Sequence, residues 1–298
     1  DGTGRIAFGS KGSGYGQFLD PEGIFYDSET GYIYIADTGN HRIVRTKMDG
    51  TGWMTLGGQQ GSGVGQFYIP TDVSFDSSTG YLYIVDCGNS RIVKTKIDGA
   101  GWATMDGFSG IRKIFYDTKM DYIYLNYEWG SKIVKTKFDK TGWTVLGTQG
   151  SGVKQFDCWN GDIYYDSDTD FIYVTDFSNH RVVKTKIDGS GWTTLGTYGG
   201  GTKQFLFPAG LAYDSKTKYL YISDVSRTVR TKIDGSDWVI ITGATGVSLS
   251  YGISDEFVNF GSFVSNVYDN GVIVNWFNIR WGGITPPGTA ITLQTRTG

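Results

Sequence analysis

Aspartate and arginine recur at matching positions along this chain of 298 residues. The recurring acids are Asp37, Asp86, Asp176 and Asp224. The basic residues downstream of them are Arg42, Arg91 and Arg181. Such a set could form a ring of acids and bases around a ligand. An aspartate can also cap a turn by accepting backbone N–H groups and pairing with its own arginine. Because a single site rarely needs identical copies, the recurrence favours turn capping.

A second group of acids could bind a divalent cation. Glu22, Asp72 and Asp162 occupy matching places in three copies of a longer repeat, and converging carboxylates are the ligands that hard cations prefer. Another copy has the cations Arg112 and Lys113 there, and the remaining copies offer no ligand. We therefore treat the three acids as weak metal candidates lining a central channel, and we expect no cofactor.

Histidine is too sparse for a zinc site. His41 and His180 are the only histidines, and they share one turn position that Ser90 and Ser131 fill in two other copies. Two histidines without a third do not complete a zinc site. The chain also lacks a Gly-x-Ser-x-Gly motif and a cysteine near a plausible histidine partner. These observations favour a protein that is not an enzyme.

Aromatic and basic residues recur as well. The tryptophans are Trp53, Trp102, Trp143, Trp192 and Trp238. They could stack on sugar rings, but they alternate with aliphatic residues and no glutamate recurs beside them, so packing between neighbouring sheets is favoured. Basic pairs two residues apart also recur, as in Arg45 and Lys47. Their spacing places each pair on one side of a strand, where they would keep an edge soluble.

These residues belong to a repeat that punctuates the whole chain. The tag Asp-Gly-x-Gly-Trp, with variations, starts at Asp1, Asp49, Asp98, Asp139, Asp188 and Asp234. Each unit contains four short apolar runs separated by turns rich in Gly, Asp, Asn, Ser and Thr. In the first complete unit the runs are 23–26, 32–36, 42–48 and 53–56. Four short strands in each unit of this length indicate one blade of a β-propeller.

The links and turns carry a family resemblance. The segment 12–24, Gly-x-Gly-x-Gly-Gln-Phe-x-x-Pro-x-Gly-Ile, and the segment 36–43, Ala-Asp-Thr-Gly-Asn-His-Arg-Ile, resemble the NHL repeat. The segment 173–176, Tyr-Val-Thr-Asp, resembles the YWTD repeat. The resemblance covers residues 1 to about 241 and implies an all-β, six-bladed propeller. It implies no single function, because these families include both binding modules and enzymes.

The two chain ends are expected to close the ring. Residues 1–9 match the fourth strand of the other units, and the last unit stops where that strand is due. We therefore predict that Ile6 and Phe8 lie in a strand that pairs with one containing Leu293, which leaves no open edge. The predicted blades of this single domain are 10–57, 58–105, 106–146, 147–195, 196–241, and 242–298 together with 1–9.

Composition limits the classes of partner. The net charge of −3 does not favour nucleic acid, and the absence of any apolar run of 18 residues excludes a transmembrane helix. The two cysteines, Cys87 and Cys158, form no disulfide framework and are expected to be free thiols. With 45 glycines and 15% aromatic residues, the chain suits many tight turns between well-filled strands.

The sequence favours a binding or structural propeller outside the cell or on its surface. Its partners would be proteins or further copies of the chain, assembled into an array or filament. The divergent last unit is the expected contact region, through Trp276, Phe277, Trp281, Pro286 and Pro287. Two alternatives stay open: a glycan-binding lectin, and a metal-dependent enzyme like the lactonases or lyases that share the implied fold.

Overall fold

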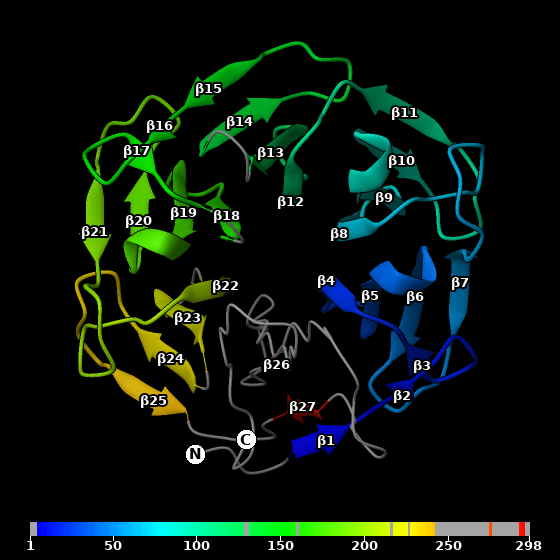
Figure 1. Cartoon of the computed structure of the whole chain (residues 1–298), viewed down its shortest axis with the longest axis horizontal. Helices are drawn as coiled ribbons and strands as arrows, with labels where there is room; N and C mark the ends of the chain where they lie inside the picture. Colours follow the sequence, from blue (N-terminus) through cyan, green and yellow to red (C-terminus); the bar gives the residue numbers. More distant parts are fainter. Residues whose placement is uncertain are drawn as a thin grey trace, which may run out of the picture.

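Five four-stranded antiparallel sheets stand around one axis as the blades of a β-propeller (Figure 1). The computed structural model describes residues 5–127, 131–158, 161–214, 217–225, 227–241, 274–275 and 292–295. From the inner to the outer strand, blade 1 contains β4 (Pro21–Asp27), β5 (Tyr32–Asp37), β6 (Arg42–Lys47) and β7 (Met54–Gly57), and blade 2 contains β8 (Pro70–Asp76), β9 (Tyr81–Asp86), β10 (Arg91–Thr95) and β11 (Ala103–Asp106). Blade 3 contains β12 (Ile111–Asp117), β13 (Tyr122–Tyr127), β14 (Lys132–Thr136) and β15 (Thr144–Leu146), and blade 4 contains β18 (Ile163–Asp166), β19 (Phe171–Asp176), β20 (Arg181–Thr185) and β21 (Thr193–Leu195). Blade 5 contains β22 (Pro208–Asp214), β23 (Tyr219–Asp224), β24 (Arg227–Thr231) and β25 (Val239–Ile241).

This arrangement confirms the prediction of an all-β propeller with four-stranded antiparallel blades. In Figure 1 the first strand of each blade lies nearest the axis, and the fourth runs along the circumference. Short 3₁₀ turns join the second and third strands of three blades: η1 (Thr38–Asn40), η2 (Cys87–Asn89) and η3 (Phe177–Asn179). Within the described residues, no helix has the length and apolar character needed to span a membrane.

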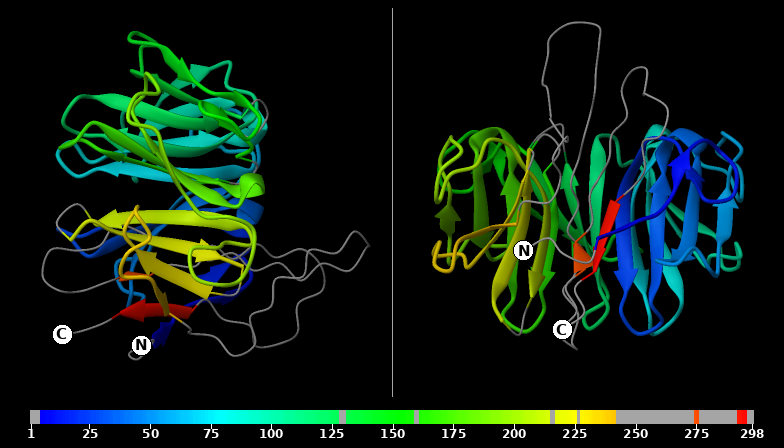
Figure 2. Two further views of the ribbon diagram at one scale, coloured as in Figure 1. Left: turned by 90° about the vertical axis from the view of Figure 1, so that its left-hand side faces the viewer. Right: turned by 90° about the horizontal axis from the view of Figure 1, so that it is seen from below.

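Smaller sheets lie between the blades and at the chain ends. Parallel two-residue pairs sit in two of the links, between β2 (Ser10–Lys11) and β3 (Gln17–Phe18), and between β16 (Thr148–Gln149) and β17 (Gln155–Phe156). A three-stranded sheet combines β1 (Arg5–Ala7), β27 (Thr292–Thr295) and β26 (Val274–Asn275). Figure 2 shows β1 beside β27, where Ile6 is the antiparallel partner of Leu293.

The core lies between blades rather than within them. Each pair of adjacent blades shares a buried apolar cluster, such as the one that combines Ile43 and Leu56 of blade 1 with Phe67 and Ile84 of blade 2. In blades 1 to 4 a tyrosine of the second strand also stacks on an aromatic ring of the next blade's first strand. The stacked pairs, with their ring-centroid distances, are Tyr34–Phe75 (4.4 Å), Tyr83–Tyr116 (4.0 Å), Tyr124–Tyr165 (4.3 Å) and Tyr173–Tyr213 (4.4 Å).

Gly23 shows how closely blades approach near the axis. A Cβ atom on Gly23 would meet the carbonyl oxygen of Thr71 in blade 2 at 2.7 Å, which is too close for a relaxed contact. Overpacking of this kind costs about 1 to 3 kcal/mol, so Gly23→Ala is expected to lower the free energy of unfolding by that amount. A Cβ atom on the exposed Gly200 meets nothing within 4 Å, so Gly200→Ala is the matched control. Equal chemical-denaturation midpoints for the two variants would contradict this account of the blade junction.

Candidate functional site at the axis of the ring

Three charged residues occupy equivalent positions beside the axis in consecutive blades. Asp72 and Lys113 lie in the first strands of blades 2 and 3, and Asp162 directly precedes the first strand of blade 4. Their relative exposures are 4%, 4% and 6%, so all three are buried. In blades 2 and 3 the pairing register shifts at this position, which marks a β-bulge in the innermost strand. The first strand of each blade is also the edge of its sheet, so one row of its backbone N–H groups faces no partner strand.

The two carboxylates use those groups to join neighbouring blades. The N–H of Ile114 in blade 3 donates to Asp72 Oδ2 at 2.9 Å. The N–H of Leu211 in blade 5 donates to Asp162 Oδ2 at 3.0 Å, one blade further round the ring. Each aspartate therefore links its own blade to the next one, which is a structural role for both acids.

Electrostatics couples the three residues. Burial raises the pKa of Asp72 to about 7; the Lys113 ammonium opposes this shift, and the Asp162 carboxylate adds to it. Burial also raises the pKa of Asp162, again opposed by Lys113. The lysine thus lies within electrostatic reach of both acids and stabilises their ionised forms.

The third acid that the sequence singled out has a different partner. Glu22 Oε1 lies 3.6 Å from Arg112 Nη2, so blade 3 supplies this cation too. We name Glu22, Asp72, Arg112, Lys113 and Asp162 the axial cluster. The structure brings Asp72 and Asp162 into electrostatic contact and pairs Glu22 with arginine. Among the described residues, no three His, Cys, Asp or Glu side chains form a group that could hold a metal ion.

The recurring Asp–Arg pair is a clamp inside four of the five described blades. In blade 2, Arg91 Nε donates to Asp86 Oδ2 at 2.7 Å, and the N–H of Tyr68 donates to Oδ1 at 2.8 Å. Other Arg91 nitrogens donate to the carbonyl oxygens of Ser62 and Gln66 in the Gly-rich link. The same Asp–Arg hydrogen bond is present in three further blades, as Asp37–Arg42 (2.7 Å), Asp176–Arg181 (2.7 Å) and Asp224–Arg227 (2.9 Å). This geometry fits the expected pairing of each aspartate with its own arginine, but the backbone N–H that the aspartate accepts belongs to the link and not to the turn, where Asp37, Asp86 and Asp176 make no side-chain capping bond.

Blade 3 lacks this clamp. Tyr127 and Lys132 replace the aspartate and the arginine, and the Lys132 Nζ atom lies 4.6 Å from the centre of the Tyr127 ring. The preceding link is also shorter than in the other blades, so the carbonyl oxygens that an arginine would bind are missing from the sequence there. The turn and the link have therefore diverged together in this blade.

The histidines lie in separate blades and bond to backbone in opposite ways. His41 Nδ1 accepts from the N–H of Ile69, whereas His180 Nδ1 bonds to the carbonyl oxygen of Leu206. A carbonyl can only accept, so His180 carries its proton on Nδ1. Neither bond leads to another metal-ligating side chain.

The tryptophans pack on phenylalanines of the links. The ring-centroid distances are Phe18–Trp53 5.4 Å, Phe67–Trp102 5.3 Å, Phe108–Trp143 5.9 Å, Phe156–Trp192 5.3 Å and Phe205–Trp238 5.2 Å. In blades 1, 2 and 4 the clamp arginine also lies over the tryptophan ring, at 5.8 to 5.9 Å. Trp143 in blade 3 has no such arginine in the repeat and is 45% exposed. These contacts fit the packing interpretation of the series.

This packing predicts a stability effect for Trp192→Ala. The substitution is expected to lower the free energy of unfolding by about 2 to 4 kcal/mol, because it removes a large ring that contacts Phe156 and Arg181. Trp143→Ala, at the matching but more exposed position, should cost about half as much. Urea unfolding followed by circular dichroism measures both, and equal small losses would contradict a packing role for Trp192.

The basic pairs have a contact that the sequence did not reveal. In each of the five described blades, one cation within the third strand and one at or directly after its end lie over one aromatic ring at the start of the second strand. The rings and cation distances are Tyr32 (Arg45 4.2 Å, Lys47 5.1 Å), Tyr81 (Lys94 4.7 Å, Lys96 5.5 Å), Tyr122 (Lys135 4.2 Å, Lys137 5.3 Å), Phe171 (Lys184 4.1 Å, Lys186 5.6 Å) and Tyr219 (Arg230 4.6 Å, Lys232 5.5 Å). The recurrence of a ring opposite each pair could have signalled these cation–π contacts.

Three further predictions concern single residues. Cys87 and Cys158 are not joined in a disulfide, as expected, and burial raises the pKa of the Cys158 thiol. Phe8 packs on Phe18 and Trp53 of blade 1, with ring centroids 6.0 and 6.2 Å apart. The predicted contact residues Trp276, Phe277, Trp281, Pro286 and Pro287 lie outside the described residues.

Comparison with known proteins supports the resemblance seen in the sequence. The model of the NHL repeat matches residues 18–45. A crystal structure of a nidogen–laminin complex contains a chain that aligns with a TM-score of 0.64 and 18% identity, over 80% of this chain and 85% of that chain. A protein of unknown function from Bacteroides thetaiotaomicron aligns with a TM-score of 0.67 and 16% identity, over 98% and 76%. No curated protein sequence matches the chain. The matches support an NHL/YWTD-like β-propeller, and at these identities the structural matches speak for the fold alone.

Proposed function

We propose that this NHL/YWTD-like propeller is a binding and structural module with six blades, which contacts proteins and assembles with further copies of itself. The observation that carries the proposal is that the recurring charged side chains bind other parts of the ring. The Asp–Arg clamps bind their own links, and the axial carboxylates bind neighbouring blades. The conspicuous polar residues thus support the ring, which leaves its exposed apolar surface for partners.

Two observations support closure of a sixth blade by both chain ends. Strand β1 pairs with β27, with Ile6 opposite Leu293. Phe8 also packs against Phe18 of blade 1, much as Leu56 at the matching place in blade 1 belongs to the apolar cluster that contains Phe67 of blade 2. A strand that closes its own ring can instead complete the ring of a neighbour, which is a direct route to assembly.

Blade 3 offers a contact surface within the described residues. Trp143 and Val145 are 45% and 47% exposed, beside and within the outer strand β15. An outer strand with exposed apolar side chains is a template for pairing with another chain. The predicted residues of the last unit, from Trp276 to Pro287, remain part of this proposal.

Sedimentation equilibrium over a range of concentrations tests self-association. We expect a mass above the 32.8 kDa of one chain at high concentration. Val145→Lys should shift the distribution toward monomer without changing the unfolding midpoint, and Val64→Lys, at an exposed residue of a link, is the control. A chain that stays monomeric at every concentration would overturn the self-assembly proposal. Association that neither variant changes would exclude blade 3 as the surface.

A further inference from the structure

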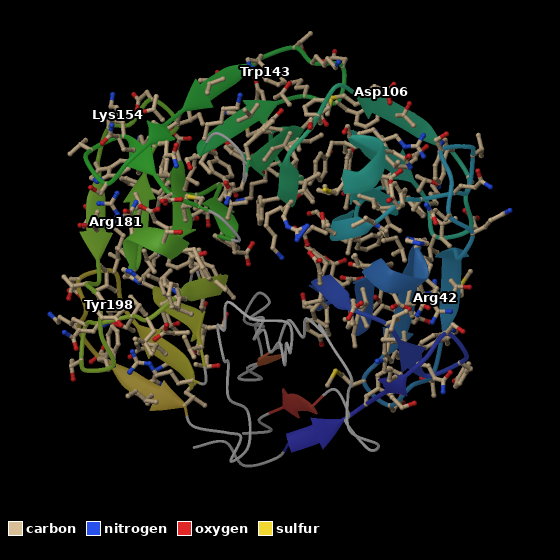
Figure 3. All side chains as sticks on the ribbon, in the orientation of Figure 1. Arg42, Asp106, Trp143, Lys154, Arg181 and Tyr198 are labelled. Atoms are coloured by element: carbon tan, nitrogen blue, oxygen red, sulfur yellow. The ribbon has the colours of Figure 1, made fainter. Side chains whose placement is uncertain are left out.

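Four aromatic side chains form a continuous surface cluster at the junction of blades 4 and 5. Phe177 lies in η3, His180 follows it, and Tyr198 and Phe207 belong to the link that leads into blade 5. Ring centroids are 5.1 Å apart for Phe177 and Phe207, 5.1 Å for His180 and Phe207, and 4.8 Å for His180 and Tyr198. Tyr198 is 66% exposed and the other three rings are half-buried. Figure 3 places Tyr198 at the outer rim, beside this junction.

Three of these rings break the repeat. The position of Phe177 holds Thr38 and Cys87 in blades 1 and 2. Residues that match Phe207 in the other long links are Asp20, Ile69 and Cys158. Those that match Tyr198 are Lys11, Gln60 and Gln149. A packing role common to all blades cannot explain aromatic residues that gather at a single junction. We therefore look for a role that is specific to the junction of blades 4 and 5.

The polar groups of the cluster set the chemistry of a ligand. Because Nδ1 of His180 donates to the Leu206 carbonyl oxygen, Nε2 of the neutral imidazole is a hydrogen-bond acceptor. Three cations of blades 4 and 5 near the cluster in sequence already have polar partners: Arg181 and Arg227 are paired with Asp176 and Asp224, and Lys203 Nζ donates to the carbonyl oxygen of Asp234. These three cations are already engaged, so they do not favour an anionic ligand. The surface therefore suits a neutral ligand that has an apolar face and hydrogen-bond donors.

We propose that the Phe177–His180–Tyr198–Phe207 cluster binds a neutral saccharide. The C–H face of a pyranose ring stacks on the Tyr198 ring, whose π face is electronegative. A sugar hydroxyl donates to His180 Nε2. A proline-rich peptide presents apolar rings too, but its prolines lack the N–H donors that this nitrogen needs. This site is independent of the assembly proposed above, since it uses neither β15 nor the chain ends.

The related junction between blades 1 and 2 provides a matched control. His41 occupies the position of His180 and has one aromatic neighbour, Tyr68, with centroids 5.8 Å apart. Its Nδ1 accepts from the N–H of Ile69, so its proton lies on Nε2. That histidine presents the opposite hydrogen-bonding character and should not form the proposed site.

Titration of the full chain with neutral trisaccharides of glucose, galactose, mannose and N-acetylglucosamine, followed by ligand-observed NMR, tests the proposal. At least one of them is expected to bind. Tyr198→Ala should weaken its binding about tenfold, the equivalent of a stacking contribution near 1.4 kcal/mol. His180→Phe should also weaken it, and Tyr68→Ala should leave it unchanged. Because Tyr198 is mostly exposed, Tyr198→Ala should keep the wild-type unfolding midpoint.

Three results would overturn the proposal. The first is that none of these saccharides binds. The second is binding that Tyr198→Ala leaves unchanged. The third is that the wild-type chain binds a proline-rich peptide but no saccharide, and that Tyr198→Ala loses this binding. That result would assign the cluster to a protein partner.

Discussion

Replacement of Arg91 by methionine is expected to lower the free energy of unfolding by about 3 to 5 kcal/mol, the cost of breaking a buried ion pair by removing one partner. Arg91 and Asp86 are both buried, and the guanidinium also holds the Ser62 and Gln66 carbonyl oxygens of the link. Methionine keeps much of the apolar stem, so the loss comes from the uncompensated carboxylate and the released link. Urea unfolding monitored by circular dichroism gives the change directly.

Lys132→Met is the matched control for this substitution. Lys132 occupies the arginine position in blade 3, where the aspartate is replaced by Tyr127 and the lysine makes only a cation–π contact in the described structure of that turn. We expect a loss below about 1 kcal/mol for it. If Arg91→Met and Lys132→Met cost the same, the clamp would not be the feature that stabilises the turn.

Replacement of Lys113 by methionine is expected to produce the second large effect, and one that depends on pH. The substitution leaves the buried Asp72 and Asp162 carboxylates without their common cation, which should cost about 3 to 5 kcal/mol at pH 8. At pH 5.5 Asp72, with a pKa of about 7, is mostly protonated in the folded protein. The loss should therefore shrink by about 1 to 2 kcal/mol at the lower pH.

The sign of the wild-type pH dependence follows from the same carboxyl. In the unfolded chain Asp72 has a pKa of about 3.9, so between roughly pH 4 and pH 7 the folded protein binds a proton that the unfolded chain does not. Its contribution to stability thus rises as the pH falls from about 7 to about 4. Asp72→Asn should remove this rise and should make Lys113→Met less costly at pH 8. A loss for Lys113→Met that is independent of pH would contradict the coupling.

The sequence predicted the four-stranded antiparallel blades because each unit repeats the same strand and turn residues. The recurring turn residues located the strands, and the recurrence of Asp37 and its equivalents indicated a structural role rather than a site, although these aspartates bind the link and not the turn backbone. The acids Glu22, Asp72 and Asp162 were singled out, and the cations Arg112 and Lys113, which the structure places beside them, were counted against a metal site. The alignment places Asp72, Lys113 and Asp162 at one position in successive units, so their proximity follows from the ring.

Burial and contacts between blades could not be predicted in the same way. The pKa of Asp72 depends on how completely the innermost strands exclude water, which no spacing in the sequence reports. The bonds from the N–H groups of Ile114 and Leu211 to Asp72 and Asp162 depend on how neighbouring blades approach, which the sequence does not report. The cluster around His180 joins a turn of one blade to the link of the next, so its residues are separated in sequence and only the structure assembles them.

A designed cross-link between the chain ends tests the closure of the ring most directly. Ile6→Cys and Leu293→Cys, placed together in a Cys87→Ser background, replace antiparallel partners of β1 and β27. Under mild oxidation, peptide mass spectrometry should find positions 6 and 293 joined, and mixed isotope-labelled chains should show whether the bond forms within or between copies. The control pairs Ile6→Cys with Thr295→Cys, two residues out of register, and should cross-link poorly. Absence of the 6–293 bond, or equal yields for both pairs, would contradict the closure.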